Sequence, residues 1–224
     1  MKEIKNFTRL HLQEIIKKKR RSYYKKRNLK KSTQIRLKEK IQNCFEKLEI
    51  IQTGNWIKQV VIGCNFCPFA AKALAKKTVR YNVVEKTDFK TALNALANEF
   101  EFLNSNENIE TTFIIFSEGF TDFLQYLDLL DKGERLLTKE NYKGIYQLAS
   151  FHPHYLFTGS NENDPANYTN RSPYPMLHIL REDSITKALE NFDDPDSIPE
   201  KNIDFAKTKG LEYMKMLAAS SIIE

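Results

Sequence analysis

Hydrophobic and polar positions recur with two different periods along the chain. Short apolar or alternating runs predict strands at residues 79–84, 111–116, 145–151 and 176–180. Apolar residues at helical spacing predict helices at residues 68–77, 88–104, 121–137, 184–192 and 202–219. Thr121 is expected to cap the helix that it begins, and residues 194–199 to form a turn. Strands that alternate with helices predict an α/β fold, here a small mixed four-stranded sheet sandwiched with helices.

The N-terminal part of the chain has a different character. Residues 1–48 are predicted as a basic helical extension, and residues 49–224 as the α/β domain. Residues 1–40 contain 16 Lys or Arg and 3 Glu, a net charge of +13, whereas the rest of the chain carries −7. The second helical pattern of the extension is expected to end at Gly54, and residues 56–62 fit either a helix or a strand.

Composition narrows the class of protein and its partners. No apolar run reaches the roughly 18–20 residues that cross a bilayer, and the N-terminus lacks the apolar core of a signal peptide, so a cytoplasmic protein without a transmembrane segment is expected. Three cysteines do not fit a secreted disulfide scaffold. The basic residues 1–40 could bind RNA or an anionic membrane surface, or form a solvated helical face.

Two cysteines precede a predicted helix. Pro68 suits the first turn of that helix, which places Cys67 at or next to its N-cap. The helix dipole lowers the pKa of a thiol at this position, so Cys67 is a candidate nucleophile, redox thiol or metal ligand. The alternative is a small residue packed among phenylalanines. Cys64 is interpreted as a packing residue, although the Cys-x-x-Cys spacing also permits a disulfide.

Three histidines lie in or directly after predicted strands. His152 and His154 are two residues apart and would point to the same side of an extended segment, where they could share a metal or bind an anion. The alternative is that one bonds to the backbone and the other is exposed. His178 interrupts an apolar strand, so it is either a satisfied polar group in the core or part of a site.

A long polar loop connects the last two strands. Residues 158–175 contain no credible helix or strand, and loops of this length in compact domains are usually functional or disordered. Tyr168 and Tyr174 give the loop apolar surface with which to anchor. The loop also offers hydrogen-bond donors for an anionic or polar ligand, namely Asn167, Asn170, Arg171 and Ser172. The alternative is a well-packed surface loop.

Three stretches of the chain resemble a known family. They are CPFA at residues 67–70, ASFHPHYLF at 149–157 and NYTNRSPYPMLHILRE at 167–182. Over about residues 50–222 the chain resembles the family catalogued as domain of unknown function 1415. The resemblance implies no particular reaction. It carries over the motif positions Cys67, His152, Asn167, Tyr168, Asn170, Arg171, Ser172, Pro173, Tyr174 and His178.

The chain departs from the family pattern at two positions. The position of Cys64 is usually apolar in that pattern, and that of His154 is often acidic. Both departures weaken a disulfide mechanism and leave Cys67 with His152 as the better core of a site. The basic extension is not part of the pattern.

These residues predict a small-molecule enzyme with one polar pocket. Cys67 would be nucleophile or metal ligand, His152 general base or ligand, and Arg171 the group that holds an anionic or polar substrate. Substrate contacts would come from Asn167, Tyr168, Asn170, Ser172, Tyr174 and His178. A bound metal, zinc or iron, would use Cys67, His152 and His154. The alternatives are a non-enzymatic ligand- or metal-binding protein, and an RNA-associated protein that uses residues 1–40.

Overall fold

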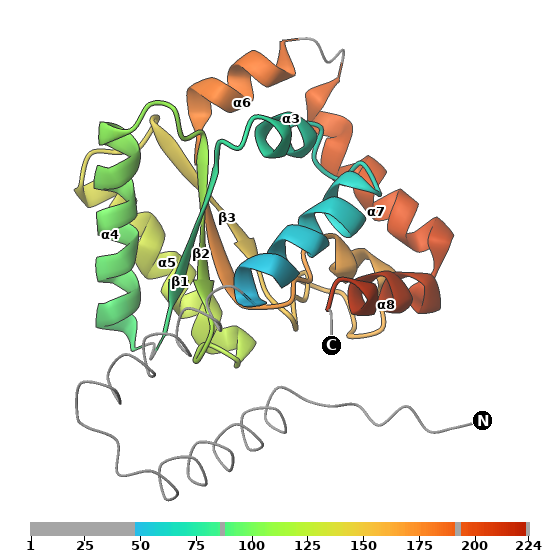
Figure 1. Ribbon diagram of the computed structural model, residues 1–224. Helices are drawn as coiled ribbons and strands as arrows, with labels where there is room; N and C mark the ends of the chain where they lie inside the picture. Colours follow the sequence, from blue (N-terminus) through green and yellow to red (C-terminus); the bar gives the residue numbers. More distant parts are fainter. Residues whose placement is uncertain (1–47, 86–87, 191–193, 223–224) are drawn as a thin grey trace, which may run out of the picture. The chain divides into compact units, whose positions relative to one another are not determined.

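A four-stranded sheet with helices on both faces forms the centre of the molecule (Figure 1). The computed structural model describes residues 48–85, 88–190 and 194–222, which belong to a compact unit from Glu46 to Glu224. The predicted α/β class is therefore confirmed. The predicted basic extension, residues 1–48, falls outside the described residues except for its last position, and so does the proposed RNA or membrane surface.

The sheet is mixed, as the sequence predicts. Its strands are β1 (Val79–Val84), β2 (Thr111–Phe116), β3 (Tyr146–Phe151) and β4 (Met176–Arg181). Their order across the sheet is β1-β2-β4-β3. Strands β1 and β2 are parallel, whereas β4 is antiparallel to both β2 and β3. All four strands lie within one residue of their predicted bounds, because short apolar runs between turn residues mark them clearly.

Two long helices cover one face of the sheet. They are α4 (Phe89–Ser105) and α5 (Phe123–Lys139), and they enclose an apolar cluster that includes Leu96, Phe100, Ile114, Tyr126, Leu129 and Leu177. Asp122, and not the predicted Thr121, caps α5, because its carboxylate accepts the N–H of Gln125 at 2.8 Å. Asp88 caps α4 in the same way, through the N–H of Thr91.

The opposite face is covered by shorter helices that come from both ends of the described chain. Residues 48–56 are helical and continue into the π-helix η1 (Ile57–Ile62), so Gly54 does not end the helix as predicted. The others are α3 (Ala70–Ala75), α7 (Ile198–Lys209) and α8 (Leu211–Ser220). The predicted helix 202–219 is two helices, because Gly210 adopts φ +82° between them. A second apolar cluster, here called the η1-side cluster, includes Trp56, Val60, Phe113, Ile115, Met176 and Met214.

The long loop before β4 contains a helix that the sequence pattern did not predict. Residues Pro165–Thr169 form the 3-10 helix η2, and the Asp164 carboxylate accepts the N–H of Ala166 at its start. A five-residue helix is too short to produce an apolar period, which explains the wrong prediction. After β4 the chain forms α6 (Glu182–Leu189) and the short helix η3 (Pro195–Ser197).

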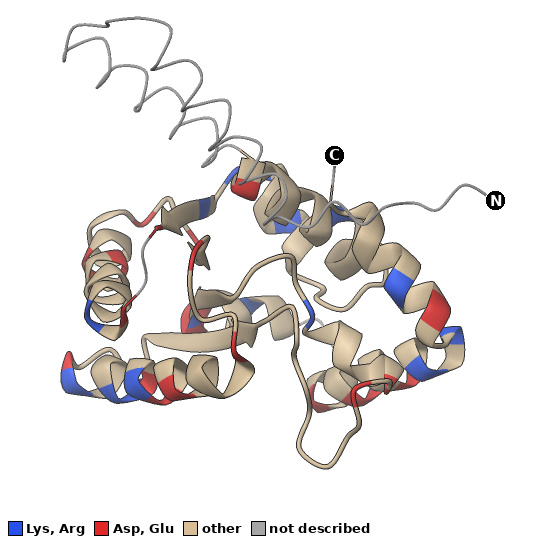
Figure 2. Cartoon of the chain, turned by 90° about the horizontal axis from the view of Figure 1, so that it is seen from below, with Lys and Arg blue, Asp and Glu red and all other residues tan. Residues whose placement is uncertain are grey.

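Charged residues of the described part lie mainly on the outer helices, and the strands carry few (Figure 2). In residues 48–85, 88–190 and 194–222 there is no helix that combines the length and apolar character needed to cross a membrane.

Candidate functional site

Cys67 lies in the turn between η1 and α3, two residues before Phe69, which is the N-cap of α3. Its half-buried sulfur accepts hydrogen bonds from the backbone N–H groups of Phe69 and Ala70, which favour the thiolate. Burial outweighs these bonds and raises the pKa of the Cys67 thiol above its usual value. The prediction of a lowered thiol pKa is therefore wrong, because the cost of desolvating the thiolate is the larger effect.

The cysteine turn is held from α7. The side-chain amide of Asn202 donates to the carbonyl oxygen of Phe66 at 2.8 Å, and the rings of Phe66 and Phe205 pack edge to face with centroids 5.7 Å apart. Cys64, inside the turn, is buried, as the packing interpretation expects. The role of Asn202 could not be predicted from the sequence, because nothing in the local pattern of α7 connects it with a residue 136 positions earlier.

His152 is fully buried next to the N-terminal end of α5. Its Nε2 donates to the carbonyl oxygen of Phe120 at 2.8 Å, since its Nδ1 accepts the backbone N–H of His154 at 3.0 Å. Burial lowers the pKa of His152. Both ring nitrogens are thus bonded to the backbone, and His154 is exposed. This arrangement matches the alternative in which one histidine bonds to the backbone and the other is exposed.

The contacts of Cys67 and His152 belong to opposite faces of the sheet. Cys67 packs against the η1-side cluster. The ring of His152 lies 5.0 Å from that of Tyr126 and 5.2 Å from that of Phe123, both on α5. No contact described here joins the predicted nucleophile to the predicted base. Within the described ranges, no three His, Cys, Asp or Glu side chains form a group that could hold a metal ion.

Asn167 stabilises the loop from inside. Its side chain is fully buried, and its Oδ1 accepts hydrogen bonds from the N–H of Phe157 at 3.0 Å and the hydroxyl of Ser160 at 2.9 Å. Its amide donates to the carbonyl oxygen of Asn161 at 2.8 Å. Both the oxygen and the nitrogen of this side chain therefore bond to the loop or to the residue just before it.

The other predicted ligand-binding residues make similar contacts. Arg171 donates to the carbonyl oxygens of Tyr155 at 3.2 Å and Glu162 at 3.0 Å, and its guanidinium lies 4.6 Å above the ring of Tyr168. Further bonds within the loop, or from it to neighbouring strands and helices, are made by Asn170 to Ser150, Ser172 to Tyr174, Tyr174 to Gln52, and Trp56 to Arg171. This arrangement is that of a well-packed surface loop.

His178 belongs to a row of side chains that crosses all four strands. Tyr81, Phe113, His178 and Ala149 are successive register partners on β1, β2, β4 and β3. The ring of Phe113 stacks on that of His178 with 3.8 Å between centroids and 8° between planes. Tyr81 continues the stack on the other side of Phe113, at 6.0 Å and 15°. The row lies on the face of the η1-side cluster, to which Phe113 and Tyr81 belong.

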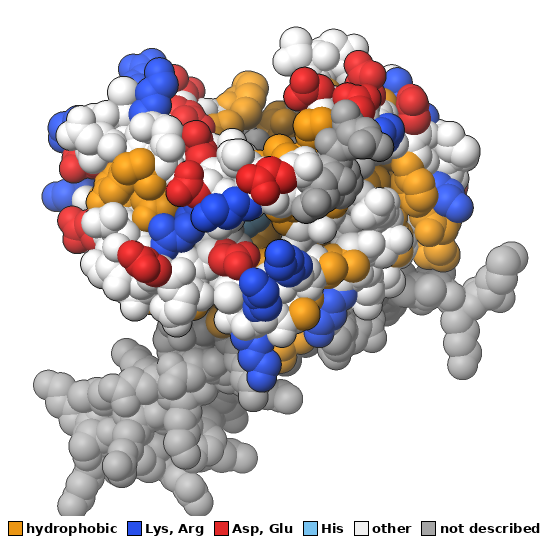
Figure 3. Space-filling model, turned by 90° about the horizontal axis from the view of Figure 1, so that it is seen from above, with side chains coloured by type: hydrophobic (Ala, Val, Ile, Leu, Met, Phe, Trp, Pro, Cys, Tyr) orange, Lys and Arg blue, Asp and Glu red, His pale blue; other side chains and the backbone are white. Residues whose placement is uncertain are grey.

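The stack of rings stops at β3, where Ala149 has only a methyl group. His178 and Ala149 are both half-buried, and Gln147, two residues before Ala149, is exposed. The face of the imidazole that points away from Phe113 therefore has no ring partner in the row. Phe151 lies diagonally across, with its ring tilted by 40° and 6.1 Å away. Figure 3, which views the chain from above, shows a hollow in which a histidine side chain is visible beside basic side chains.

Thr111 fixes the position of the His178 ring. The Nε2 atom of His178 lies 2.5 Å from the Thr111 hydroxyl, which lies 2.6 Å from the carbonyl oxygen of Ile179. Burial lowers the pKa of His178 to about 3, so the ring is neutral at physiological pH. The sequence pattern did not point to Thr111, Tyr81, Phe113 or Ala149, since only the strand register brings them close to His178.

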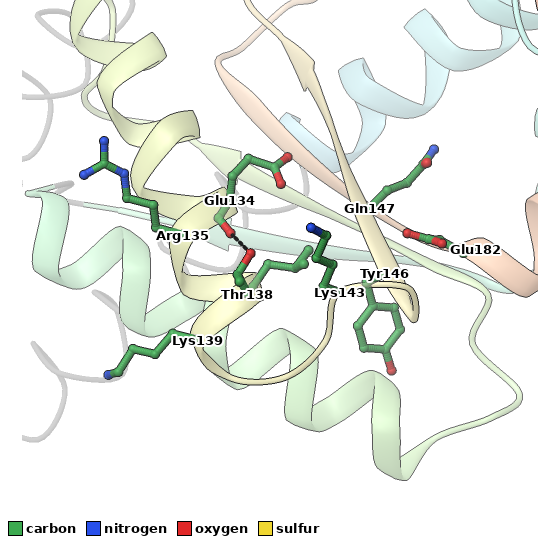
Figure 4. Close-up of a pocket in the computed structure, with 9 residues that line it drawn as sticks. Glu134, Arg135, Thr138, Lys139, Lys143, Tyr146, Gln147 and Glu182 are labelled. Carbon is green, nitrogen blue, oxygen red and sulfur yellow. Dashed lines mark hydrogen bonds between the residues drawn. The ribbon is translucent and has the colours of Figure 1, made fainter.

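A separate cavity of about 600 Å³ lies between α5 and the start of β3. Figure 4 shows the side chains of Glu134 and Lys143 extending into it, whereas Arg135 and Lys139 point away. None of the residues predicted from the sequence lines this cavity. Its rim carries charges of both signs, mostly on solvent-exposed side chains, where solvent screens them.

Comparison with known proteins identifies the family. The model of a family described as "protein of unknown function (DUF1415)" matches residues 49–216. The chain belongs to this family. The DUF1415 match spans the sheet, both helical layers and the row of Tyr81, Phe113, His178 and Ala149, and it leaves out the basic extension. No curated protein and no solved structure matches the chain.

Proposed function

We propose that the DUF1415 domain of this chain binds a small molecule on the η1-side face of its sheet, with a planar group of that molecule stacked on His178. The observation that carries the proposal is the end of the ring stack at Ala149, where the row Tyr81–Phe113–His178 has no fourth ring. Neighbouring strands are about 4.8 Å apart, so a flat group above Ala149 would lie at stacking distance from the imidazole.

The surroundings of this position suit a small ligand. Pockets for small molecules have mainly apolar walls with a few polar groups that orient the ligand. Here the apolar surface is formed by Phe151 and the methyl group of Ala149, and the polar groups by His178 and the exposed Gln147. Aromatic stacking contributes about 0.5–1.5 kcal/mol beyond the burial of surface, which would orient the ligand without requiring charge.

Binding accounts for the geometry better than the thiol or metal chemistry predicted from the sequence. A catalytic Cys67 would need a base to remove its proton, because the pKa of its thiol is raised. His152, the predicted base, has both nitrogens bonded to backbone groups. Cys67 instead packs against the η1-side cluster as a protonated thiol. The RNA-associated alternative concerns residues 1–40, which lie outside the described ranges.

The test uses the full chain labelled at its histidine rings. Indole, benzamide and benzoate serve as planar probes, and NMR follows the imidazole signals of His178, assigned by the His178→Phe variant. We expect at least one probe to shift these signals in a saturable way. Ala149→Phe should abolish the shift by filling the position of the fourth ring, and the matched control Ala149→Ser should preserve it. If no probe shifts His178, or if Ala149→Phe binds the probes as well as the natural chain, the proposal is rejected.

A further inference from the structure

The hydrogen bonds around Thr111 determine which nitrogen of His178 carries the proton. The Thr111 oxygen makes two short contacts, 2.5 Å to Nε2 of His178 and 2.6 Å to the carbonyl oxygen of Ile179. A hydroxyl has one hydrogen, and a carbonyl oxygen can only accept. Both contacts contain a hydrogen only if Thr111 donates to Ile179 and His178 donates to Thr111. The ring therefore carries its proton on Nε2.

The second ring nitrogen is consequently an acceptor. In a neutral imidazole with a protonated Nε2, the Nδ1 atom has a lone pair in the plane of the ring. Nδ1 of His178 has no hydrogen-bond partner within the described part of the chain. Nδ1 is also not one of the unpartnered side-chain atoms that are completely buried, so a ligand can reach it. The half-buried ring thus offers a ligand one stacking face and one acceptor nitrogen.

We infer that His178 selects a neutral planar ligand with an N–H or O–H donor, and discriminates against carboxylates and phosphates. The inference rests on the proposed function and names the class of ligand for the same site. A lone pair attracts a donor hydrogen and repels an anionic oxygen. The low pKa of His178 supports this choice, because the ring does not become a cation at physiological pH.

Neither Arg171 nor the other members of the row provide a free positive charge for an anion. Arg171 is the cation that was predicted to hold an anionic substrate. Its guanidinium donates hydrogen bonds to the carbonyl oxygens of Tyr155 and Glu162. The members of the row apart from His178 are Tyr81, Phe113 and Ala149, which are uncharged at neutral pH. The burial that raises the pKa of Tyr81 keeps its hydroxyl protonated. The anionic ligand allowed by the sequence analysis is therefore the less favoured class.

The first test concerns the ring itself and needs no ligand. Nitrogen-15 NMR of the full chain distinguishes a protonated from an unprotonated ring nitrogen. For His178 we expect a protonated Nε2 and an unprotonated Nδ1 at neutral pH. Thr111→Val keeps the shape of the side chain, removes the hydroxyl, and should leave a mixture of the two tautomers. A proton on Nδ1 in the natural chain, or a charged ring at neutral pH, would overturn the inference.

The second test compares matched probes on the natural chain and on His178→Phe. Indole has an N–H donor, N-methylindole has the same rings without it, and benzoate is a planar anion. On the natural chain we expect indole to bind about tenfold more tightly than N-methylindole, and benzoate more weakly than either. On His178→Phe, which keeps a stacking ring, the preference for indole should disappear, and fluorescence of the probes can measure binding there.

The outcomes separate the two proposals. Equal affinities for indole and N-methylindole on the natural chain, or tighter binding of benzoate, would overturn the inferred ligand class while the binding site remains. If none of the three probes binds to the natural chain, the proposed function fails as well. If the preference for indole persists in His178→Phe, recognition of the donor belongs to another group, and the role given to His178 is wrong.

Discussion

The imidazole of His178 lies flat against the ring of Phe113, with 3.8 Å between their centroids and 8° between their planes. These residues are 65 positions apart in the chain and become neighbours because β2 and β4 pair in antiparallel register. The stack makes His178 part of an aromatic row and leaves one of its faces to the half-buried position above Ala149. The proposed site therefore depends on strand register and not on any local sequence motif.

The neutral histidines should make stability fall in acid. The pKa of His178 is about 3 in the folded chain, and an unfolded histidine titrates near 6.5. Its contribution is complete above about pH 6.5 and is lost as the pH falls from there toward 3, by at most about 1.4 kcal/mol per pH unit. Burial shifts the pKa of His152 in the same direction. Urea unfolding between pH 7.5 and 4.5 should show a weaker pH dependence for His178→Phe than for the natural chain. Equal slopes would contradict the prediction.

Loss of the Asn167 side chain should destabilise the loop and the domain. Asn167→Ala removes three hydrogen bonds from a fully buried position and leaves the N–H of Phe157 without its partner. The expected cost is about 2–4 kcal/mol, since a buried group without a partner costs about 1–3 kcal/mol in addition to the bonds lost. Urea denaturation measures it. The control is Asn163→Ala, at an exposed position of the same loop, which should change stability by less than about 0.5 kcal/mol.

The Tyr126 hydroxyl should protect the end of the β3–β4 ladder. It donates to the carbonyl oxygen of Met176 at 2.6 Å and accepts the N–H of Phe151 at 3.1 Å, so it bridges two residues that are register partners. Tyr126→Phe should cost about 1–3 kcal/mol, because both backbone groups lose their partner. Hydrogen exchange of the Phe151 amide should accelerate more than that of amides in β1.

The control for this prediction is Tyr213→Phe, on half-buried α8, where the hydroxyl has no hydrogen bond within the described residues. That variant should leave stability and the exchange of Phe151 nearly unchanged. Equal effects of the two substitutions would show that the bridge contributes nothing.

The Cys67 thiol should react slowly with alkylating reagents as long as Asn202 holds its turn in place. Burial raises the pKa of the thiol, so little thiolate is present at neutral pH. Alkylation by iodoacetamide, located by peptide mass spectrometry to separate Cys67 from Cys64, should be slower than for a free cysteine at pH 7 and rise with pH. Asn202→Ala removes the bond to the Phe66 carbonyl and should increase the rate several-fold.

Asn98→Ala, at an exposed position on α4, is the control for Asn202→Ala and should leave the alkylation rate unchanged. A rate for the natural chain equal to or above that of a free cysteine would contradict the raised pKa. The same rate in Asn202→Ala and in the natural chain would mean that Asn202 does not hold the turn.

Sequence patterns predicted the elements well and the contacts between them less well. The four strands and the helices α4 and α5 follow from apolar periodicity, because each has enough residues to express its period. The helix η2 was not predicted, because five residues are too few to show a helical period. The break at Gly210 was not predicted, because it depends on a single backbone angle. The cap of α5 was placed one residue early, at Thr121, where two adjacent residues could both cap.

The candidate site was only partly accessible to such reasoning. His178 was recognised as a histidine in an apolar strand, with its two roles left open. The partners that define its chemistry, Thr111 and Phe113, come from β2 and have no signature of their own. The polar loop was recognised as unusual, but whether its donors face a ligand or one another depends on how the loop folds. In the structure, Asn167 and Arg171 bond within the loop.

By itself the sequence determined the α/β class, the mixed four-stranded sheet, the bounds of its strands and membership in the DUF1415 family, because period and motif are local properties of a chain. Only the tertiary structure decided which side chains meet. Strand order and register set Tyr81, Phe113, His178 and Ala149 in one row, and the sheet separates the contacts of Cys67 from those of His152. The physical reason is that pairing between strands joins residues distant in sequence, so burial, proton position and free ring faces arise only after the sheet has formed.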